Sequence, residues 1–161
     1  MKSKEIKETK KIIEHKFFVL DTAVRNKNHR FYGDEVVSKW PSDKRLKNEG
    51  IDIEFALEEN AETENEYLID HLSCGIVKVL ELEGTKLYAT VKFKLNDLTK
   101  DIYEEKLKLD DIAIVPKGKG SVKNQRVQDD YELFGFNLVK KNESTFIFDE
   151  KEAETETAKS A

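Results

Sequence analysis

One short segment of this chain brings an acid, a base and a hydroxyl together. Asp70, His71 and Ser73 are three of four consecutive residues. A hydroxyl becomes a nucleophile when an adjacent base takes its proton, and residues two apart on a strand share one face. The segment is therefore a candidate nucleophile and base pair. The simpler interpretation, which we prefer, is that His71 is an ordinary polar residue at the entry of a strand.

The remaining chemically active side chains give weaker signals. Cys74 is the only cysteine, which excludes an internal disulfide and a cysteine-based metal site. Its apolar neighbours, among them Leu72 and Ile76, predict simple burial. His15 and His29 have no ligand-like spacing with Asp, Glu or Cys. We therefore expect no metal site and no cofactor.

A basic segment punctuated by glycines follows an apolar run at 112–115. Glycines beside lysines allow backbone N–H groups to approach a phosphate or an acidic partner. Because no aromatic residues are interleaved, nucleic acid is not the expected ligand. A solvated turn is the alternative. The candidate binding residues are Lys117, Gly118, Lys119, Gly120, Lys123 and Arg126.

The overall composition restricts the class of protein. The chain has 161 residues and a net charge of −5, with 38% charged and 38% hydrophobic residues. It is long enough for one domain with a real core. No apolar run approaches the length of a membrane span, and no apolar signal core follows the basic start. We expect an intracellular protein in a reducing compartment, with no membrane partner.

Period-2 patterns predict a strand-rich centre. Hydrophobic residues from Leu87 to Leu95 alternate with polar ones, and an apolar run at 76–80 precedes them. Glu83-Gly84 lies between the two runs, so the pattern predicts a β-hairpin. Further strands are expected at 17–20, 122–127 and 131–139.

Helices and polar segments complete the expected organisation. Helices are predicted after Gly33-Asp34, with Pro41 near the end, and after Asn96, with Leu98, Ile102 and Leu107 on one side. Residues 49–70 hold nine acidic residues and no Lys or Arg, as in a solvated loop with some extended structure. The expected organisation is a loose N-terminal helix at 1–15, a domain at 16–141 and an acidic disordered tail at 142–161.

Four segments resemble, in order, the tailed-phage prohead proteases, which are the serine proteases that mature viral capsids. The loop at 112–121 is similar to the family's Val-Ser-Ser-Arg-Gly-x-Gly nucleophile loop. Residues 25–32 resemble its Asn-x-Asn-x-Arg-x-Tyr-Pro stretch, and residues 75–93 resemble its hairpin. Residues 127–139 resemble its closing strands, which end in Phe-Asp-x-Val. The resemblance implies an α+β fold with a mainly antiparallel β-barrel or sheet and a few flanking helices.

The departures from the family pattern fall on its catalytic positions. Val115 and Pro116 stand where the family has serines, and Pro116 also lacks the N–H of an oxyanion donor. Glu58 or Glu59 stands where the family histidine belongs, and Asn137 replaces the carboxylate. Asparagine cannot supply the negative charge that stabilises an imidazolium. The resemblance therefore implies a degenerate member with no catalytic residues.

Three functions follow as hypotheses. The first is a non-catalytic, prohead-protease-like protein that binds phage capsid, scaffold or core proteins, or another copy of itself, during assembly in the host cytoplasm, inside the prohead or in the virion. The second is an active maturation protease with a rearranged site that uses His71, Ser73 and Asp70. The third is a phage-encoded interaction module for a host protein or nucleic acid. Opposite charges on the acidic 49–70 and basic 117–126 segments also allow head-to-tail association.

Overall fold

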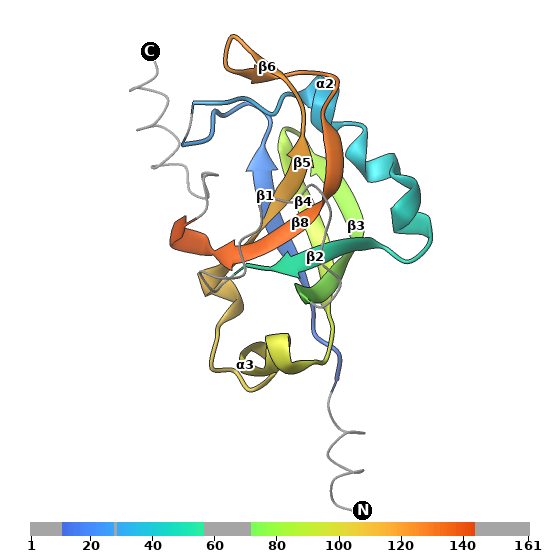
Figure 1. The fold of residues 1–161 in the computed structure, drawn as a ribbon, viewed down its shortest axis with the longest axis vertical. Coiled ribbons are helices and arrows are strands. Elements are labelled where there is room, and N and C mark those ends of the chain that lie inside the picture. Colours follow the sequence, from blue (N-terminus) through green and yellow to red (C-terminus); the bar gives the residue numbers. More distant parts are fainter. Residues whose placement is uncertain (1–10, 28, 57–71, 144–161) are drawn as a thin grey trace, which may run out of the picture.

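Six strands form one curled, mixed sheet in the computed structural model, which describes residues 11–27, 29–56 and 72–143 (Figure 1). The strand order is β1-β4-β3-β2-β8-β5. Neighbouring strands are antiparallel except for β2 and β8, which are parallel. The predicted α+β class with a mainly antiparallel sheet is therefore confirmed. The strands are β1 (Glu14–Asp21), β2 (Ile51–Phe55), β3 (Ser73–Glu83), β4 (Lys86–Phe93), β5 (Ile112–Lys119) and β8 (Glu132–Lys140).

Short helices and a small hairpin cover the two ends of the sheet. Helix α2 (Asp34–Val37) lies at one end with the hairpin of β6 (Val122–Lys123) and β7 (Arg126–Val127), and α3 (Lys100–Tyr103) lies at the other (Figure 1). No helix in the described ranges is long and apolar enough to cross a membrane. The 3₁₀ helices are η1 (Trp40–Ser42), η2 (Lys44–Lys47), η5 (Asp97–Thr99), η6 (Leu109–Asp111) and η7 (Lys141–Glu143).

The predicted hairpin is present as β3 and β4. Its loop is two residues long, because Glu83 pairs with Lys86. Gly84 takes a φ of 66°, a left-handed conformation that glycine adopts without the steric cost of a side chain. Every second side chain of β4 is buried, as the alternating pattern predicts. The hydrophobic core that these strands share is centred on Leu87, Ala89, Val91, Phe93, Ile51, Ile53, Ile114, Phe136 and Leu138.

The acidic 49–70 segment contains the expected extended structure, but this part is buried and not a solvated loop. Its residues 51–55 form β2, an inner strand of the sheet between β3 and β8. Ile51 and Ile53 are fully buried. The solvated environment was wrongly predicted because the acidic residues were given more weight than the alternation of apolar ones, which is the physical signal for a buried strand. Residues 57–71 lie outside the described part of the chain.

The basic loop differs from the prediction at two points. β5 continues through Pro116 to Lys119, where a turn was expected. Pro116 fits there because β5 is the last strand in the sheet order, so a missing N–H costs fewer ladder bonds. The single strand predicted at 122–127 is instead the β6–β7 hairpin, which turns at Asn124 and Gln125, both with positive φ.

The predicted helices begin close to the expected residues but are shorter than predicted. Asn96 caps η5, since its side chain accepts hydrogen bonds from the N–H groups of Leu98 and Thr99. α3 ends at Tyr103, short of Leu107. Strand β1 begins at Glu14, so the last two residues of the expected N-terminal helix are in a strand. Residues 1–10 and the tail at 144–161 lie outside the described ranges.

Candidate functional site

The two strands that resemble the family's nucleophile and carboxylate strands are direct neighbours. β5 pairs with β8 in a register that sets Val115 opposite Asn137. Asn137 alternates with the buried Phe136 and Leu138, so its side chain lies on the face of the sheet away from the core. The positions singled out from the sequence therefore meet, and they bring together an aliphatic side chain and an amide.

This pair belongs to a row of residues that crosses four strands. Glu54 of β2 lies opposite Asn137 of β8 on one side and opposite Ser73 of β3 on the other. Residues opposite each other on neighbouring strands share a face of the sheet. The row, which we call the polar row, therefore consists of Ser73, Glu54, Asn137 and Val115.

A buried ion pair lies at the centre of the polar row. Lys117 is two residues after Val115, so it shares the same face, and its Nζ lies 2.9 Å from Glu54 Oε2. The exposed fractions of these side chains are only 11% for Lys117 and 2% for Glu54. Charges this deeply buried require a partner. The charge of Lys117, which the sequence marked for binding, is thus engaged inside the molecule.

Ser73 is held in a separate hydrogen-bond network. Its Oγ accepts from Lys94 Nζ at 2.8 Å and donates to Asp52 Oδ1 at 3.1 Å. Neither partner is a histidine. Ser73 is also three strands away from Val115, about 14 Å along the sheet at the usual strand spacing. Asp70, His71, Glu58 and Glu59 lie outside the described residues, so the proposed pairing of His71 with Ser73 stays a prediction.

Cys74 is a buried thiol, as expected. The residue is fully buried, and its Sγ lies 3.5 Å from the carbonyl oxygen of Ile53. Burial raises the pKa of the Cys74 thiol to about 12. The thiolate needed for a nucleophile or a metal ligand is therefore scarce at neutral pH.

The two glycines of the basic segment make room for Tyr131. A Cβ on Gly118 would lie 2.3 Å from the carbonyl oxygen of Glu132 and 2.5 Å from the Tyr131 hydroxyl. A Cβ on Gly120 would lie 2.6 Å from the Tyr131 Cα. Both glycines thus have a packing role. Whether Gly118, Gly120 and the exposed Lys119 and Lys123 also bind a partner stays a prediction.

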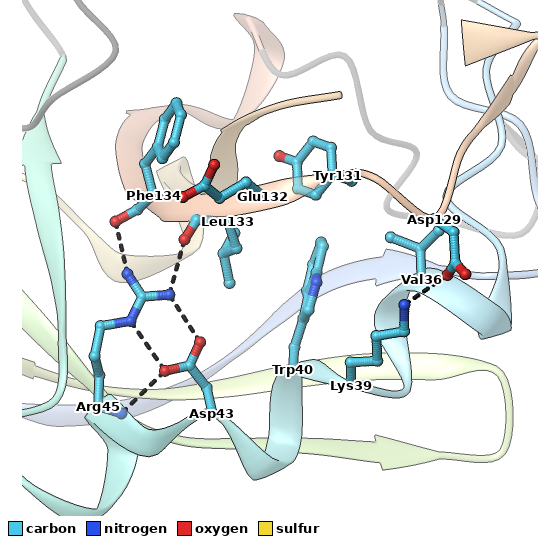
Figure 2. A pocket seen from close by; sticks show the side chains of 10 residues that line it. All are labelled: Val36, Lys39, Trp40, Asp43, Arg45, Asp129, Tyr131, Glu132, Leu133 and Phe134. Carbon is cyan, nitrogen blue, oxygen red and sulfur yellow. Dashed lines mark hydrogen bonds and ion pairs between the residues drawn. The ribbon is translucent and has the colours of Figure 1, made fainter. Parts of the chain in front are cut away.

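Tyr131 also lines a pocket of about 600 Å³ (Figure 2). Its apolar wall includes Trp40, whose ring centroid is 5.7 Å from that of Tyr131. Burial raises the pKa of Tyr131, so its phenol is neutral at physiological pH. The volume lies within the range of small-ligand sites. The lining residues are Val36, Lys39, Trp40, Asp43, Arg45, Asp129, Tyr131, Glu132, Leu133 and Phe134.

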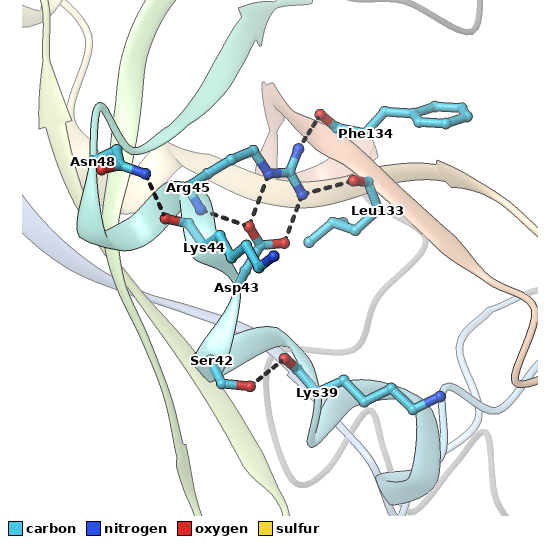
Figure 3. Close-up of polar contacts among 8 residues, drawn as sticks. All are labelled: Lys39, Ser42, Asp43, Lys44, Arg45, Asn48, Leu133 and Phe134. Carbon is cyan, nitrogen blue, oxygen red and sulfur yellow. Dashed lines mark hydrogen bonds and ion pairs between the residues drawn. The ribbon is translucent and has the colours of Figure 1, made fainter.

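Arg45 joins the wall of this pocket to the start of β8 (Figure 3). Its Nε and Nη2 donate to the two carboxylate oxygens of Asp43, at 2.9 and 2.8 Å. Its Nη1 and Nη2 also donate to the carbonyl oxygens of Phe134 and Leu133, at 2.9 and 2.8 Å. β2 pairs with β8 only at residues 136–138. Arg45 therefore satisfies carbonyl groups where β2 no longer covers the edge of β8.

The Asp43–Arg45 pair predicts a pH dependence of stability. The Arg45 side chain, followed by its backbone N–H and its charge, holds the pKa of Asp43 below its usual 3.8. A lowered pKa stabilises the fold above the unfolded-state value, and this contribution is lost as pH falls through the folded-state value. The Asp43→Asn variant should therefore unfold more easily than wild type near pH 6, and the difference should shrink below about pH 4. Urea denaturation at both pH values measures it; an equal difference at both would contradict the assignment.

Several residues of these sites were missed from the sequence. Glu54 was placed in a solvated loop, although its position between Ile53 and Phe55 is the signal of a strand residue. Asp43 and Arg45 carry no motif, and their partners at 133–134 are distant in the chain. The pocket joins residues 36–45 to 129–134, and no local pattern could have indicated it.

Comparison with known proteins gives a likeness of fold. The structure is similar to that of the bacteriophage T4 capsid assembly protease gp21, with a TM-score of 0.62 and 15% sequence identity. The match covers 80% of this chain and 90% of that one. No protein-family model and no curated protein sequence matches the chain. The prohead-protease-like fold expected from the resemblance is thus supported by a solved structure.

Proposed function

We propose that this chain is a non-catalytic protein of the prohead-protease-like fold that acts in capsid assembly by binding other proteins of the phage particle. The observation that carries the proposal is the register that sets Val115 opposite Asn137. A serine protease needs a hydroxyl nucleophile and an oriented base, and neither of these side chains supplies one. The fold that the chain shares with a capsid assembly protease supports the proposed role in capsid assembly.

The buried ion pair supports the same proposal. A general base must be free to take a proton from the reacting group. The carboxylate of Glu54 instead accepts a hydrogen bond from Lys117, and its exposed fraction of 2% leaves little access for a substrate. Two charges that satisfy each other under the surface serve to hold β2 against β5 across β8.

Cleavage assays test the absence of activity. We expect purified protein to leave the phage's own scaffold and capsid proteins intact under maturation conditions, and a serine-directed covalent probe to leave Ser73 unlabelled. Gel electrophoresis and mass spectrometry measure both. Specific cleavage that disappears in Ser73→Ala or in another single variant would refute the proposal and favour the rearranged protease.

Co-expression tests the binding role. With the scaffold and capsid proteins of the same phage, the chain should sediment with assembled proheads and remain uncleaved. Heat-denatured protein of the same sequence, added after assembly, is the control for passive trapping. If the chain stays at the top of the gradient in every combination, the assembly role fails even though the chain lacks protease activity.

A further inference from the structure

The fold joins two basic segments that are far apart in the sequence. Phe31 forms a bridge with Arg126 of β7. Its N–H donates to the Gln125 carbonyl at 2.8 Å, and its own carbonyl accepts from the Val127 N–H at 2.9 Å. The described residues that precede Phe31, at 25–27 and 29–30, therefore lie near the β6–β7 hairpin. We call the resulting surface the basic end; its positive residues are Arg25, Arg30, Lys119, Lys123 and Arg126.

An aromatic ring organises two of these positive charges. The guanidinium carbons of Arg25 and Arg126 lie over the Phe31 ring, at 5.0 and 5.4 Å from its centre. Such contacts hold a cation in place without neutralising it. In the described part of the chain, Arg25 Nε is buried and has no hydrogen-bond partner. The basic end thus contains fixed positive charge, together with the exposed side chains of Arg30 and Lys123.

Three carboxylates near the basic end have ion-pair or hydrogen-bond partners. Glu35 pairs with Arg126 at 2.9 Å, and Asp129 pairs with Lys39 at 2.5 Å. Asp130 accepts a hydrogen bond from the Ser121 N–H at 3.0 Å, which lowers the pKa of its carboxyl group. Arg25, Arg30 and Lys123 form no ion pair with these three carboxylates, so their positive charges favour an acidic partner.

The chain itself contains a strongly acidic sequence. Residues 57–71 contain six acidic residues and no Lys or Arg. They are flanked by Ala56, whose N–H donates to the Leu138 carbonyl, and by Leu72, which precedes β3. Leu138 pairs with Ile114 near the start of β5, whereas Lys119 at the end of β5 borders the basic end. Ala56, the last described residue before the acidic sequence, is thus separated from the basic end by most of the length of β5.

We propose that the basic end binds the acidic segment 57–71 of a second copy, so that copies associate head to tail. Two different surfaces then meet at each contact, which leads to a ring if the rotation closes and to an open chain of copies if it does not. This inference rests on the proposed binding role and names the chain itself as a partner. A chain that does not associate with itself but lacks protease activity and joins proheads would contradict this inference and leave the proposed function intact.

The geometry favours an acidic polypeptide over nucleic acid. Single-stranded nucleic acid is usually held by bare aromatic faces on which bases stack. The Phe31 ring is occupied by guanidinium groups instead.

Sedimentation velocity of the full chain tests the inference. The apparent mass should rise above 18.7 kDa with protein concentration at low salt and fall back at high salt, since screening weakens contacts between exposed charges. Arg30→Glu combined with Lys123→Glu should weaken the association more than about tenfold. Lys100→Glu combined with Lys108→Glu makes the same charge change at the far end and should leave the association in place.

Mixing two defective variants gives the sharper result. The basic-end variant keeps its acidic segment, and a variant with Glu59, Glu62 and Glu64 changed to lysine keeps its basic end. Each should be monomeric alone, and the mixture should form dimers and nothing larger, because one competent contact remains. Unchanged association of either variant, or no dimer in the mixture, overturns the proposal. Low-salt binding of a labelled DNA oligonucleotide that the basic-end changes abolish, without self-association of wild type, would assign the surface to nucleic acid instead.

Discussion

Replacing Lys117 by methionine should lower the free energy of unfolding by about 3–5 kcal/mol, because it leaves the buried Glu54 carboxylate without its partner. The two side chains are among the least exposed charged groups of the described residues, at 11% and 2%. An unpaired charge at such a position either costs desolvation energy or takes up a proton. Urea denaturation followed by circular dichroism measures the loss.

Two further variants make this expectation specific. Lys123→Met removes the same charge from an exposed residue of the hairpin, and its unfolding free energy should stay within about 0.5 kcal/mol of wild type. The double change Glu54→Leu with Lys117→Met removes both charges and should recover most of the loss, since apolar pairs often replace buried ion pairs without cost. If the Lys117→Met and Lys123→Met proteins were equally stable, the ion pair of Lys117 with Glu54 would not contribute to stability.

Replacing Arg45 by alanine should cost about 2–3 kcal/mol, because hydrogen bonds that involve a charged group each contribute more than neutral ones. The change removes the fork that binds Asp43 and frees the carbonyl groups of Leu133 and Phe134. Trp40 is the only tryptophan and lines the same pocket, so its fluorescence should report the loosening directly.

Two control variants separate the effect of the Arg45 charge from that of its planar, bidentate geometry and its position. Arg45→Lys keeps the charge but not the planar fork, so it should recover less than half of the loss. Lys44→Ala removes a neighbouring exposed charge and should leave both the stability and the Trp40 fluorescence unchanged. An Arg45→Ala protein as stable as Lys44→Ala would show that solvent satisfies the two carbonyl groups equally well.

The sheet could be predicted from the sequence where the apolar pattern was undisturbed by charge. β4 alternates cleanly, and Gly84 marks its turn, so the hairpin with β3 followed directly. β2 was not predicted as a buried strand because Asp52 and Glu54 occupy its alternate positions. Acidic residues at such positions are also typical of a solvated loop. The burial of Glu54 could not be predicted locally, because its partner Lys117 lies on β5, 63 residues away in the sequence.

The candidate site could be predicted in part for the same reason. Val115 and Asn137 were singled out from two separate motifs, and the register of β5 with β8 sets them opposite each other. The basic residues among the binding candidates were chosen by charge, which cannot distinguish the buried Lys117 from the exposed Lys123. Phe31 was not predicted to organise the basic end, because one of its arginine partners, Arg126, is 95 residues away in the sequence.

The parallel contact between β2 and β8 has a consequence for how the chain folds. β1, β2, β3 and β4 are complete once the first 93 residues have been made, but β8 ends at residue 140. Until then, β2 is an uncovered edge strand that can pair with other chains. Long-range pairing of this kind also slows folding. Refolding should therefore be limited by the arrival of β8, and aggregation should increase when synthesis stops between β4 and β8.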